Sequence, residues 1–518
     1  MYDVIIIGGG IVGCAAAREL SRYRLKILVV ERGADIAIGA TKANSGILHA
    51  GYDCRPGTLK AELNVKGAAL YPGLCKELDI PYRINGSMVI GTDENAAARL
   101  KALYEQGLAN GVTGMELLSA EEALALEPNL TNKVTGALRA KTAGVISPYE
   151  AGIAFGESAA INGVEFLLET EITGVEGDNK KGYTVYTAGA FPIKTLNASR
   201  HSGLDPESPE PLGKGWGIPG QARDDETVCN GAPLKAKIII NAAGINSAAI
   251  HNFISPNKEE IIPQRGQYFL LDNTQRGLVG HTIFPLPTHL GKGALIVPTV
   301  DYNILLGPTA EAPESPAATG TTAEGLKEAL DKVSMLLKSV PIHDRITAYT
   351  GIRAKHMGKD FIIEETTPGF IDAMGIDSPG LTAAPAIAQR IAKLVTVRLQ
   401  PKLNADFIPV RIGIKGFRQL PRAEQAAIIK ENPAYGRVVC RCETITEAEI
   451  IDAIKRPLGA KNLDALKRRT RAQMGRCQGG FCKIRLVELL SREMGVPETA
   501  VTMDGAGSEV MYEKPLPV

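Results

Sequence analysis

The pattern of apolar and polar positions predicts a strand, a helix and a second strand at the start of the chain. Residues 3–8 are an apolar run rich in β-branched side chains, which is typical of a strand buried in a parallel sheet. A segment with small side chains predicts a helix through about residue 23, and residues 26–31 predict the next strand. This order indicates an α/β unit built on a parallel sheet.

The glycines between the first strand and the helix have the spacing G-x-G-x-x-G, as Gly8, Gly10 and Gly13. The first permits a tight turn, the second lets backbone approach a pyrophosphate, and the third lets the helix lie close to the strand. Glu31 ends the second strand and can accept hydrogen bonds from adenosine ribose hydroxyls. A structural glycine-rich turn is the alternative, but the complete strand, helix, strand and acid favour a dinucleotide site.

Three further segments contain the glycines and small residues needed where backbone passes close to a nucleotide. Residues 40–51 are polar and glycine-rich, residues 238–244 are a buried strand with a small-residue end, and residues 375–385 lead into a predicted helix at 384–394. Amides at a helix start favour negative charge, such as develops on a reduced flavin. The further candidates for cofactor contact are Arg32, Thr41, Asn44, Ser45, Gly46, Gly244, Gly380, Leu381 and Thr382.

At these segments the chain resembles the FAD-dependent amino-acid oxidase superfamily over residues 1 to about 400, and within it anaerobic-type glycerol-3-phosphate dehydrogenases and L-2-hydroxyglutarate oxidases. The stretches N-S-G-I-L-H-A-G and T-A-A-P-A-I-A carry most of the resemblance. It implies FAD and an α/β fold with two domains. We expect a Rossmann-like FAD-binding domain at 1–79, 146–259 and 350–396, and an antiparallel-sheet α+β substrate domain at 80–145 and 260–349.

The motif at residues 349–356, Y-T-G-I-R-A-K-H, supplies the expected substrate contact. In similar enzymes an arginine here holds the substrate's anionic group, and a guanidinium fork suits carboxylate or phosphate. Arg353 is therefore expected to bind substrate, with a structural ion pair as the alternative. Lys355, His356 and Arg265 are further substrate-binding candidates whose alternative is a solvated surface. His49 is expected near the flavin ring as a base or a positioning group, unless it is a core histidine.

Four cysteines near the C-terminus, Cys440-x-Cys442 and Cys477-x4-Cys482, predict a metal centre. Glycines let the second loop wrap a compact inorganic core, and neighbouring basic side chains offset the charge of thiolate-ligated iron. The spacing resembles the bacterioferritin-associated-ferredoxin-like domain, which holds a 2Fe–2S cluster. Structural zinc and a metal-free fold are the alternatives. A flavoprotein neighbour favours the redox-active metal.

The C-terminal part is predicted to be a small, mainly helical iron–sulfur domain at residues 436–500. Helices are expected at 447–455, capped by Thr446, at 463–470 and at 483–493. A proline-bearing linker at 397–435 precedes this domain, and a tail at 501–518 follows it. Residues 190–232 are rich in Pro, Gly, Ser and charge, resemble translated palindromic repeat elements, and are expected to be a disordered insertion that interrupts a hairpin.

Composition excludes several classes of function. The formal net charge is +1, so the chain has no overall positive field that would attract nucleic acid. It has one tryptophan, so an aromatic surface on which bases stack is not expected. The first strand follows the initial Met directly, and the uncharged stretch at 4–17 is too short to span a membrane. We expect a cytoplasmic enzyme with at most peripheral membrane association.

These features together predict an FAD-dependent dehydrogenase of a small anionic substrate. The leading expectation is oxidation of sn-glycerol 3-phosphate to dihydroxyacetone phosphate, with electrons passing through the 2Fe–2S cluster to a partner reductase or the quinone pool. The sequence barely distinguishes a site for a substrate phosphate from a site for a substrate carboxylate. L-2-hydroxyglutarate or another 2-hydroxy or amino acid is therefore the alternative substrate. A non-catalytic electron-transfer flavoprotein is the second alternative.

Overall fold

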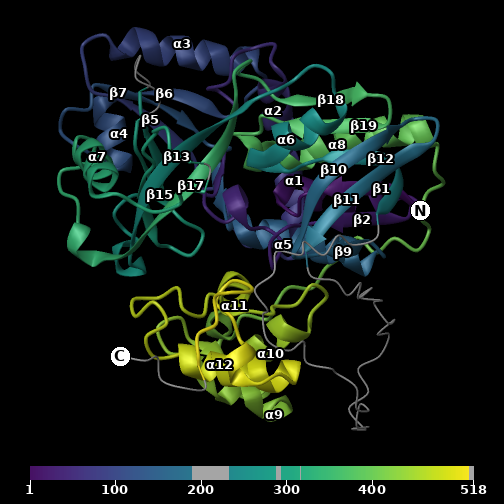
Figure 1. Cartoon of the computed structure of the whole chain (residues 1–518). Coiled ribbons are helices and arrows are strands. Elements are labelled where there is room, and N and C mark those ends of the chain that lie inside the picture. The colour runs from purple at the N-terminus through teal and green to yellow at the C-terminus, as the bar shows by residue number, and fades with distance from the viewer. Residues whose placement is uncertain (190–232, 287–292, 316, 513–518) are drawn as a thin grey trace.

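The computed structural model describes residues 1–189, 233–286, 293–315 and 317–512. Two large sheets lie side by side, and the C-terminal helices, yellow in Figure 1, form a separate layer below them. The expected insertion at 190–232 lies outside the described residues. Within the part of the chain that is described, no helix is long and apolar enough to cross a membrane.

The first sheet is the predicted Rossmann-like sheet. Its parallel core has the order β9–β2–β1–β12–β19, and antiparallel β10, β11 and β18 extend it. The strands are β1 (Tyr2–Ile7), β2 (Ile27–Val30), β9 (Glu165–Leu167), β10 (Thr170–Asp178), β11 (Gly182–Gly189), β12 (Leu234–Asn241), β18 (Ile362–Thr367) and β19 (Phe370–Met374). Since β11 and β12 pair antiparallel, the hairpin predicted around the insertion is confirmed.

Four helices cover the parallel sheet and bury their apolar faces with β1, β2 and β12 in one core. They are α1 (Ile11–Leu20), α2 (Leu59–Leu78), α5 (Pro148–Ile161) and α8 (Gly380–Leu399), while α6 (Ser247–Ile254) packs against β10 and β19. The start of α8 differs from the predicted start at residue 384. Pro385 cannot donate to the Leu381 carbonyl, but the Tyr71 hydroxyl donates to that carbonyl at 2.7 Å and replaces the missing hydrogen bond.

The second sheet has eight strands in the order β17–β13–β16–β15–β14–β5–β7–β6 and is antiparallel except for the β14–β5 pair. The strands are β5 (Ser87–Gly91), β6 (Met115–Ser119), β7 (Gly136–Ala140), β13 (Ile261–Leu271), β14 (Thr282–Pro285), β15 (Leu295–Pro298), β16 (Ile304–Gly307) and β17 (Arg345–His356). Helices α3 (Ala96–Ala109), α4 (Ala120–Leu126) and α7 (Ala323–Ser334) pack on it. The predicted α/β class, with an antiparallel sheet beside the Rossmann-like sheet, is confirmed.

The C-terminal part is mainly helical, as predicted. Helices α10 (Glu447–Lys455), α11 (Leu463–Thr470) and α12 (Lys483–Met494) surround one small core beside the short strands β20 (Val438–Cys440) and β21 (Ile445–Thr446). Thr446 and Glu449 form a capping box at the start of α10. The segment predicted to be a linker contains an ordered helix, α9 (Arg422–Glu431).

Candidate cofactor and substrate site

The turn between β1 and α1 depends on two glycines for its own geometry. Gly8 has φ +108°, and a Cβ on it would lie 2.5 Å from the Ala242 carbonyl oxygen. A Cβ on Gly13 would lie 1.9 Å from the Gly8 carbonyl oxygen. By contrast, a Cβ on Gly10 would meet only Thr41 Oγ1, at 3.4 Å, among the described residues. The fold therefore does not require a glycine at position 10. The space beside Gly10 suits a ligand instead, as the motif predicts.

Glu31 is fixed at the end of β2, at the edge of this turn. Its Oε2 accepts from the Gly9 amide and its Oε1 accepts from the Gly33 amide, both at 2.8 Å. The carboxylate is buried, whereas neighbouring Arg32 is exposed. Thr41 Oγ1 accepts from the Ile11 amide, at 3.0 Å, in the first turn of α1. This anchored acid beside an open glycine turn fits the adenosine half of FAD.

The loop after η1 (Gly39–Thr41) is held by its own asparagine. Asn44 Nδ2 donates to the carbonyls of Ala40 and Thr41, each at 3.0 Å, and its Oδ1 accepts from the Gly46 amide at 2.8 Å. Gly46 has φ +64°, and a Cβ there would lie 2.5 Å from the Ile146 carbonyl oxygen. Ser45 is partly buried between them. Asn44 thus shapes the loop, a role that its sequence position alone does not indicate.

His49 is tied to the start of α8. Its backbone amide donates to Thr382 Oγ1 at 2.9 Å, and that hydroxyl donates to the Ile47 carbonyl at 3.2 Å. The imidazole Nε2 lies 3.5 Å from Ser378 Oγ, and its ring centroid lies 5.9 Å from that of Phe284. Gly380 and Leu381 begin this helix, and Gly244, with φ +57°, begins η2 (Gly244–Asn246) after β12. The structure therefore joins the His49 loop to the helix start that sequence predicts for the flavin.

Arg353 lies on the face of the β13–β17 pair that contacts the loop after η1, at residues 43 and 44. It pairs across the strands with Gln264, whose Oε1 accepts from Arg353 NH1 at 3.2 Å. Gly351 is on the same face, and a Cβ there would lie 1.9 Å from the Ala43 carbonyl oxygen. Sequence reasoning missed Gln264, which the strand register places opposite Arg353. It also missed Tyr349, which donates from its hydroxyl to the Asn44 carbonyl at 3.0 Å.

The other substrate candidates are divided between the two faces of this strand pair. Lys355 follows Arg353 by two residues and shares its face. Arg265 is buried on the opposite face, where its NH2 lies 3.2 Å from Glu311 Oε2. His356 also faces away from Arg353, and its Nε2 lies 2.8 Å from Glu259 Oε2. The structure therefore brings Lys355, but neither Arg265 nor His356, to the face that carries Arg353.

The four C-terminal cysteines form two pairs. Cys442 Sγ and Cys477 Sγ are 3.4 Å apart, and Cys440 pairs with Cys482. The hydrogen bond with Cys482, followed by the backbone amides of Gln473 and Glu443, lowers the pKa of Cys440 to about 6. Among the described residues, no three or more His, Cys, Asp or Glu side chains converge on one metal position. Two thiolate pairs with amide donors suit a binuclear iron–sulfur cluster better than one tetrahedral zinc ion.

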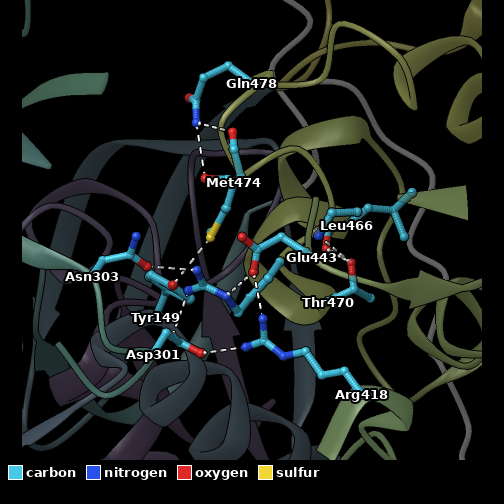
Figure 2. Close-up of polar contacts among 12 residues, drawn as sticks. Tyr149, Asp301, Asn303, Arg418, Glu443, Leu466, Thr470, Met474 and Gln478 are labelled. Atoms are coloured by element: carbon cyan, nitrogen blue, oxygen red, sulfur yellow. Dashed lines mark hydrogen bonds and ion pairs between the residues drawn. The ribbon is translucent and has the colours of Figure 1, made fainter. Parts of the chain in front are cut away.

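A cavity of about 350 Å³ lies between the three parts of the molecule. Loop residues 42–46, the end of the second sheet and the segment 464–478 line it. Figure 2 shows that Tyr149, at the start of α5, points towards Met474, and its hydroxyl lies 3.5 Å from Met474 Sδ. Burial raises the pKa of this phenol above its usual range. Loop residues 42–46 and the segment that leads into the cysteine-bearing loop thus meet at one cavity.

Comparison with known families decides the identity of both parts. The family described as FAD dependent oxidoreductase matches residues 3–394. This chain belongs to that family. The family described as BFD-like [2Fe-2S] binding domain matches residues 438–492, so this FAD dependent oxidoreductase carries an iron–sulfur domain at its C-terminal end. The predictions of FAD and of a 2Fe–2S cluster are confirmed.

Individual relatives of this FAD dependent oxidoreductase agree with the assignment. A glycerol 3-phosphate dehydrogenase of Caloramator mitchellensis is 41% identical and covers 99% of this chain and 98% of its own length. The FAD-bound L-alpha-glycerophosphate oxidase of Mycoplasma pneumoniae matches with TM-score 0.68 and 28% identity, covering 79% of this chain and 98% of its own. Human mitochondrial L-2-hydroxyglutarate dehydrogenase is 29% identical over 60% of this chain and 61% of its own length.

Proposed function

We propose that this oxidoreductase converts sn-glycerol 3-phosphate to dihydroxyacetone phosphate and passes the electrons through its 2Fe–2S cluster to a partner reductase or the quinone pool. The observation that carries the proposal is the 41% identity to a glycerol 3-phosphate dehydrogenase over 99% of the chain. That similarity extends over both the flavin part and the iron–sulfur part of this chain.

Oxidation of the secondary alcohol removes a proton from oxygen and a hydride from carbon. Bound FAD would supply the acceptor of the hydride, and the cluster would supply a one-electron acceptor through which the two electrons pass one after the other to the partner. In the proposed site Arg353 binds the phosphate, and Gln264 orients its guanidinium through the 3.2 Å hydrogen bond. Lys355, on the same face, adds a second positive charge. Holding the anionic end fixes the distance between the reacting carbon and the nucleotide site.

His49 is proposed to accept the alcohol proton. Its backbone is held by Thr382 at 2.9 Å, and its Nε2 has Ser378 Oγ at 3.5 Å as a neighbour. A neutral imidazole can accept a proton near neutral pH without a large change in its environment. The amide end of α8, at Gly380, Leu381 and Thr382, lies beside the same loop and favours the negative charge that develops during the oxidation.

The cofactor contacts are proposed to follow the geometry of the glycine turn. Gly8, Gly10 and Gly13 admit the pyrophosphate, Glu31 binds the adenosine ribose, and Thr41, Asn44, Ser45 and Gly46 shape the loop beside the flavin. Arg32 and Gly244 lie at the edges of this site. Glu31 can exchange its hydrogen bonds with the Gly9 and Gly33 amides for bonds with ribose hydroxyls.

A partner is proposed to dock beside the cluster. Of the four ligand cysteines, Cys442 is exposed and Cys440 and Cys482 are buried, so the protein covers the centre from one side. Phe481, immediately before Cys482, is 83% exposed. An exposed aromatic side chain next to a redox ligand suits a contact that a second protein covers transiently.

The experiment is an anaerobic reduction of the purified enzyme by candidate substrates, followed by the loss of flavin absorbance. We expect rapid bleaching with sn-glycerol 3-phosphate and slow or no bleaching with its enantiomer, sn-glycerol 1-phosphate. Dithionite serves as the control that the flavin is reducible. Bleaching by L-2-hydroxyglutarate alone would support the second candidate, which the similarity to the human enzyme favours. No bleaching by any metabolite would favour a non-catalytic electron-transfer protein.

A further inference from the structure

Three carboxylates, of which Asp35 and Glu157 are buried and Asp301 is partly buried, join the C-terminal part to the rest of the molecule, and each binds two arginines from the segment 411–471. They are Asp35 with Arg468 and Arg469, Glu157 with Arg411 and Arg456, and Asp301 with Arg418 and Arg471. Figure 2 shows the third of these, where Arg418 lies between Asp301 and Glu443. We call these three carboxylates and their six arginines the domain seam.

Asp35 differs from the other two carboxylates because it belongs to the loop after β2, residues 31–37, which contacts the glycine turn and which we call the nucleotide loop. It lies four positions after Glu31, and two residues later the Ala37 amide donates to the Gly9 carbonyl at 2.8 Å. Ile36, between them, is fully buried in the core of the Rossmann-like part. The conformation of residues 31–37 therefore sets the position of Gly9 and of the Glu31 carboxylate.

The contacts of Asp35 with α11 are close and buried. Arg469 binds both carboxylate oxygens, NH1 to Oδ2 at 2.7 Å and NH2 to Oδ1 at 2.8 Å, and Arg468 NH2 lies 2.7 Å from Oδ2. The side chains of Asp35, Arg468 and Arg469 are 5%, 4% and 1% exposed. Despite burial, the guanidinium groups of Arg469 and Arg468 hold the pKa of Asp35 below its usual range. A bidentate, fully desolvated pair of this kind fixes both the distance and the orientation of its partners.

Helix α11 also leads directly into the cysteine-bearing loop. Arg471, the residue after this helix, binds Glu443 at 3.0 Å through its Nε, and Glu443 is adjacent to Cys442. The same short segment is therefore joined to the nucleotide loop at one end and to the cysteines at the other.

We propose that the iron–sulfur domain is a structural part of the FAD site, in which Arg468 and Arg469 hold the nucleotide loop through Asp35. Without this contact, the loop loses its anchor and FAD binds more weakly, even though α11 is distant in sequence from the glycine turn. Because binding linkage is reciprocal, bound FAD also stabilises the docked position of α11. The inference rests on the proposed adenosine contact at Glu31 but is independent of the substrate.

The test is the Kd for FAD, measured by fluorescence titration of full-length apoflavoprotein whose cluster is intact by visible absorbance. Asp35→Asn should raise the Kd about 10-fold, a loss of about 1.4 kcal/mol. Arg468→Met should raise it about 3-fold, because Arg469 keeps its two bonds to Asp35. Asp301→Asn is the matched control, since Asp301 also binds two seam arginines but lies after β15; its Kd should stay within about 2-fold of wild type.

Three results would overturn the inference. The first is an unchanged Kd in folded Asp35→Asn and Arg468→Met proteins. The second is a Kd raised equally by Asp301→Asn, which would indicate a general loosening of the molecule. The third is an unchanged Kd in Glu31→Gln, which would remove the adenosine contact on which the inference rests. If Asp35→Asn fails to fold, the comparison of the Kd of Arg468→Met with that of Asp301→Asn decides whether the inference holds.

Discussion

The nucleotide turn and the domain seam position neighbouring parts of one site by opposite means. The turn uses backbone from residues 8–13, where a Cβ on Gly8 or on Gly13 would lie only 2.5 or 1.9 Å from a carbonyl oxygen. The seam uses buried charge, and its partners are separated by up to 434 residues. The close fit at Gly13 is local to the turn and that at Gly8 is against Ala242, after β12, whereas every contact in the seam joins distant parts of the chain.

This difference has an energetic consequence. The turn contains no ionised group that must lose its hydration, so its stability follows from packing and hydrogen bonds. The buried seam carboxylates Asp35 and Glu157 have lost water, and their arginines compensate for that loss only while each carboxylate and both of its arginines are in place. The seam therefore makes the position of the iron–sulfur domain specific, and it is more sensitive than the turn to the loss of a single charge.

The largest expected effect is at the turn. Gly13→Val places a side chain where even a Cβ would lie 1.9 Å from the Gly8 carbonyl oxygen, so we expect loss of FAD and failure to fold. Purified protein would show no flavin absorbance and reduced far-UV circular dichroism. Gly73→Ala, in α2 where a Cβ meets nothing within 4 Å, is the control and should be neutral or stabilising by about 1 kcal/mol. A yellow, folded Gly13→Val protein would contradict the account of the turn.

At the seam, Glu157→Gln should lower the free energy of unfolding by about 3–5 kcal/mol, because it leaves Arg411 and Arg456 buried without their common anion. Urea denaturation monitored by circular dichroism measures the loss. Glu62→Gln, which removes an exposed pair with Lys66 within α2, should cost no more than about 0.5 kcal/mol. Equal losses in the two variants would mean that the seam is no stronger than a surface ion pair.

On the face proposed to bind substrate, Arg353→Ala should reduce kcat/KM about 100-fold, the value of a charge-assisted hydrogen bond to the substrate anion, while FAD stays bound. Steady-state kinetics with sn-glycerol 3-phosphate measure this loss, and the flavin spectrum checks retention. Arg345→Ala removes an exposed arginine at the other end of β17 and should change kcat/KM little. An active Arg353→Ala enzyme would refute the proposed anion site.

The smallest expected effect is a pH dependence next to the seam. Burial, followed by the charge of Asp301, raises the pKa of Glu150 to about 7, and the nearby guanidinium groups of Arg471 and Arg411 limit the rise. A carboxyl group with a raised pKa stabilises the fold fully below its unfolded pKa, and the contribution is lost as pH rises through 7. Glu150→Gln should therefore flatten the decline in stability between pH 5.5 and 7.5 by about 2 kcal/mol. Parallel stability–pH curves for variant and wild type would contradict this.

Sequence alone predicts the features that depend on near neighbours. The glycine turn, the helices at 447–455 and 463–470 and the Thr446 cap follow from local patterns, and the structure reproduces them. The start of α8 was mispredicted because a tertiary contact from Tyr71 compensates for Pro385. Strand register places Gln264 beside Arg353 and turns Arg265 to the other face, and no local pattern reports register across 89 residues. In the sequence, the seam arginines cannot be distinguished from ordinary surface arginines, because the acids that they bind are distant and meet them only in the assembled fold.

The central claim is that electrons taken from the substrate reach the cluster within one polypeptide. The direct measurement is EPR of the anaerobic enzyme, frozen after addition of less than one equivalent of sn-glycerol 3-phosphate. The account predicts a reduced iron–sulfur signal that appears as the flavin absorbance falls. A cluster that gives this signal with dithionite but stays silent with substrate, while the flavin bleaches, would contradict the account.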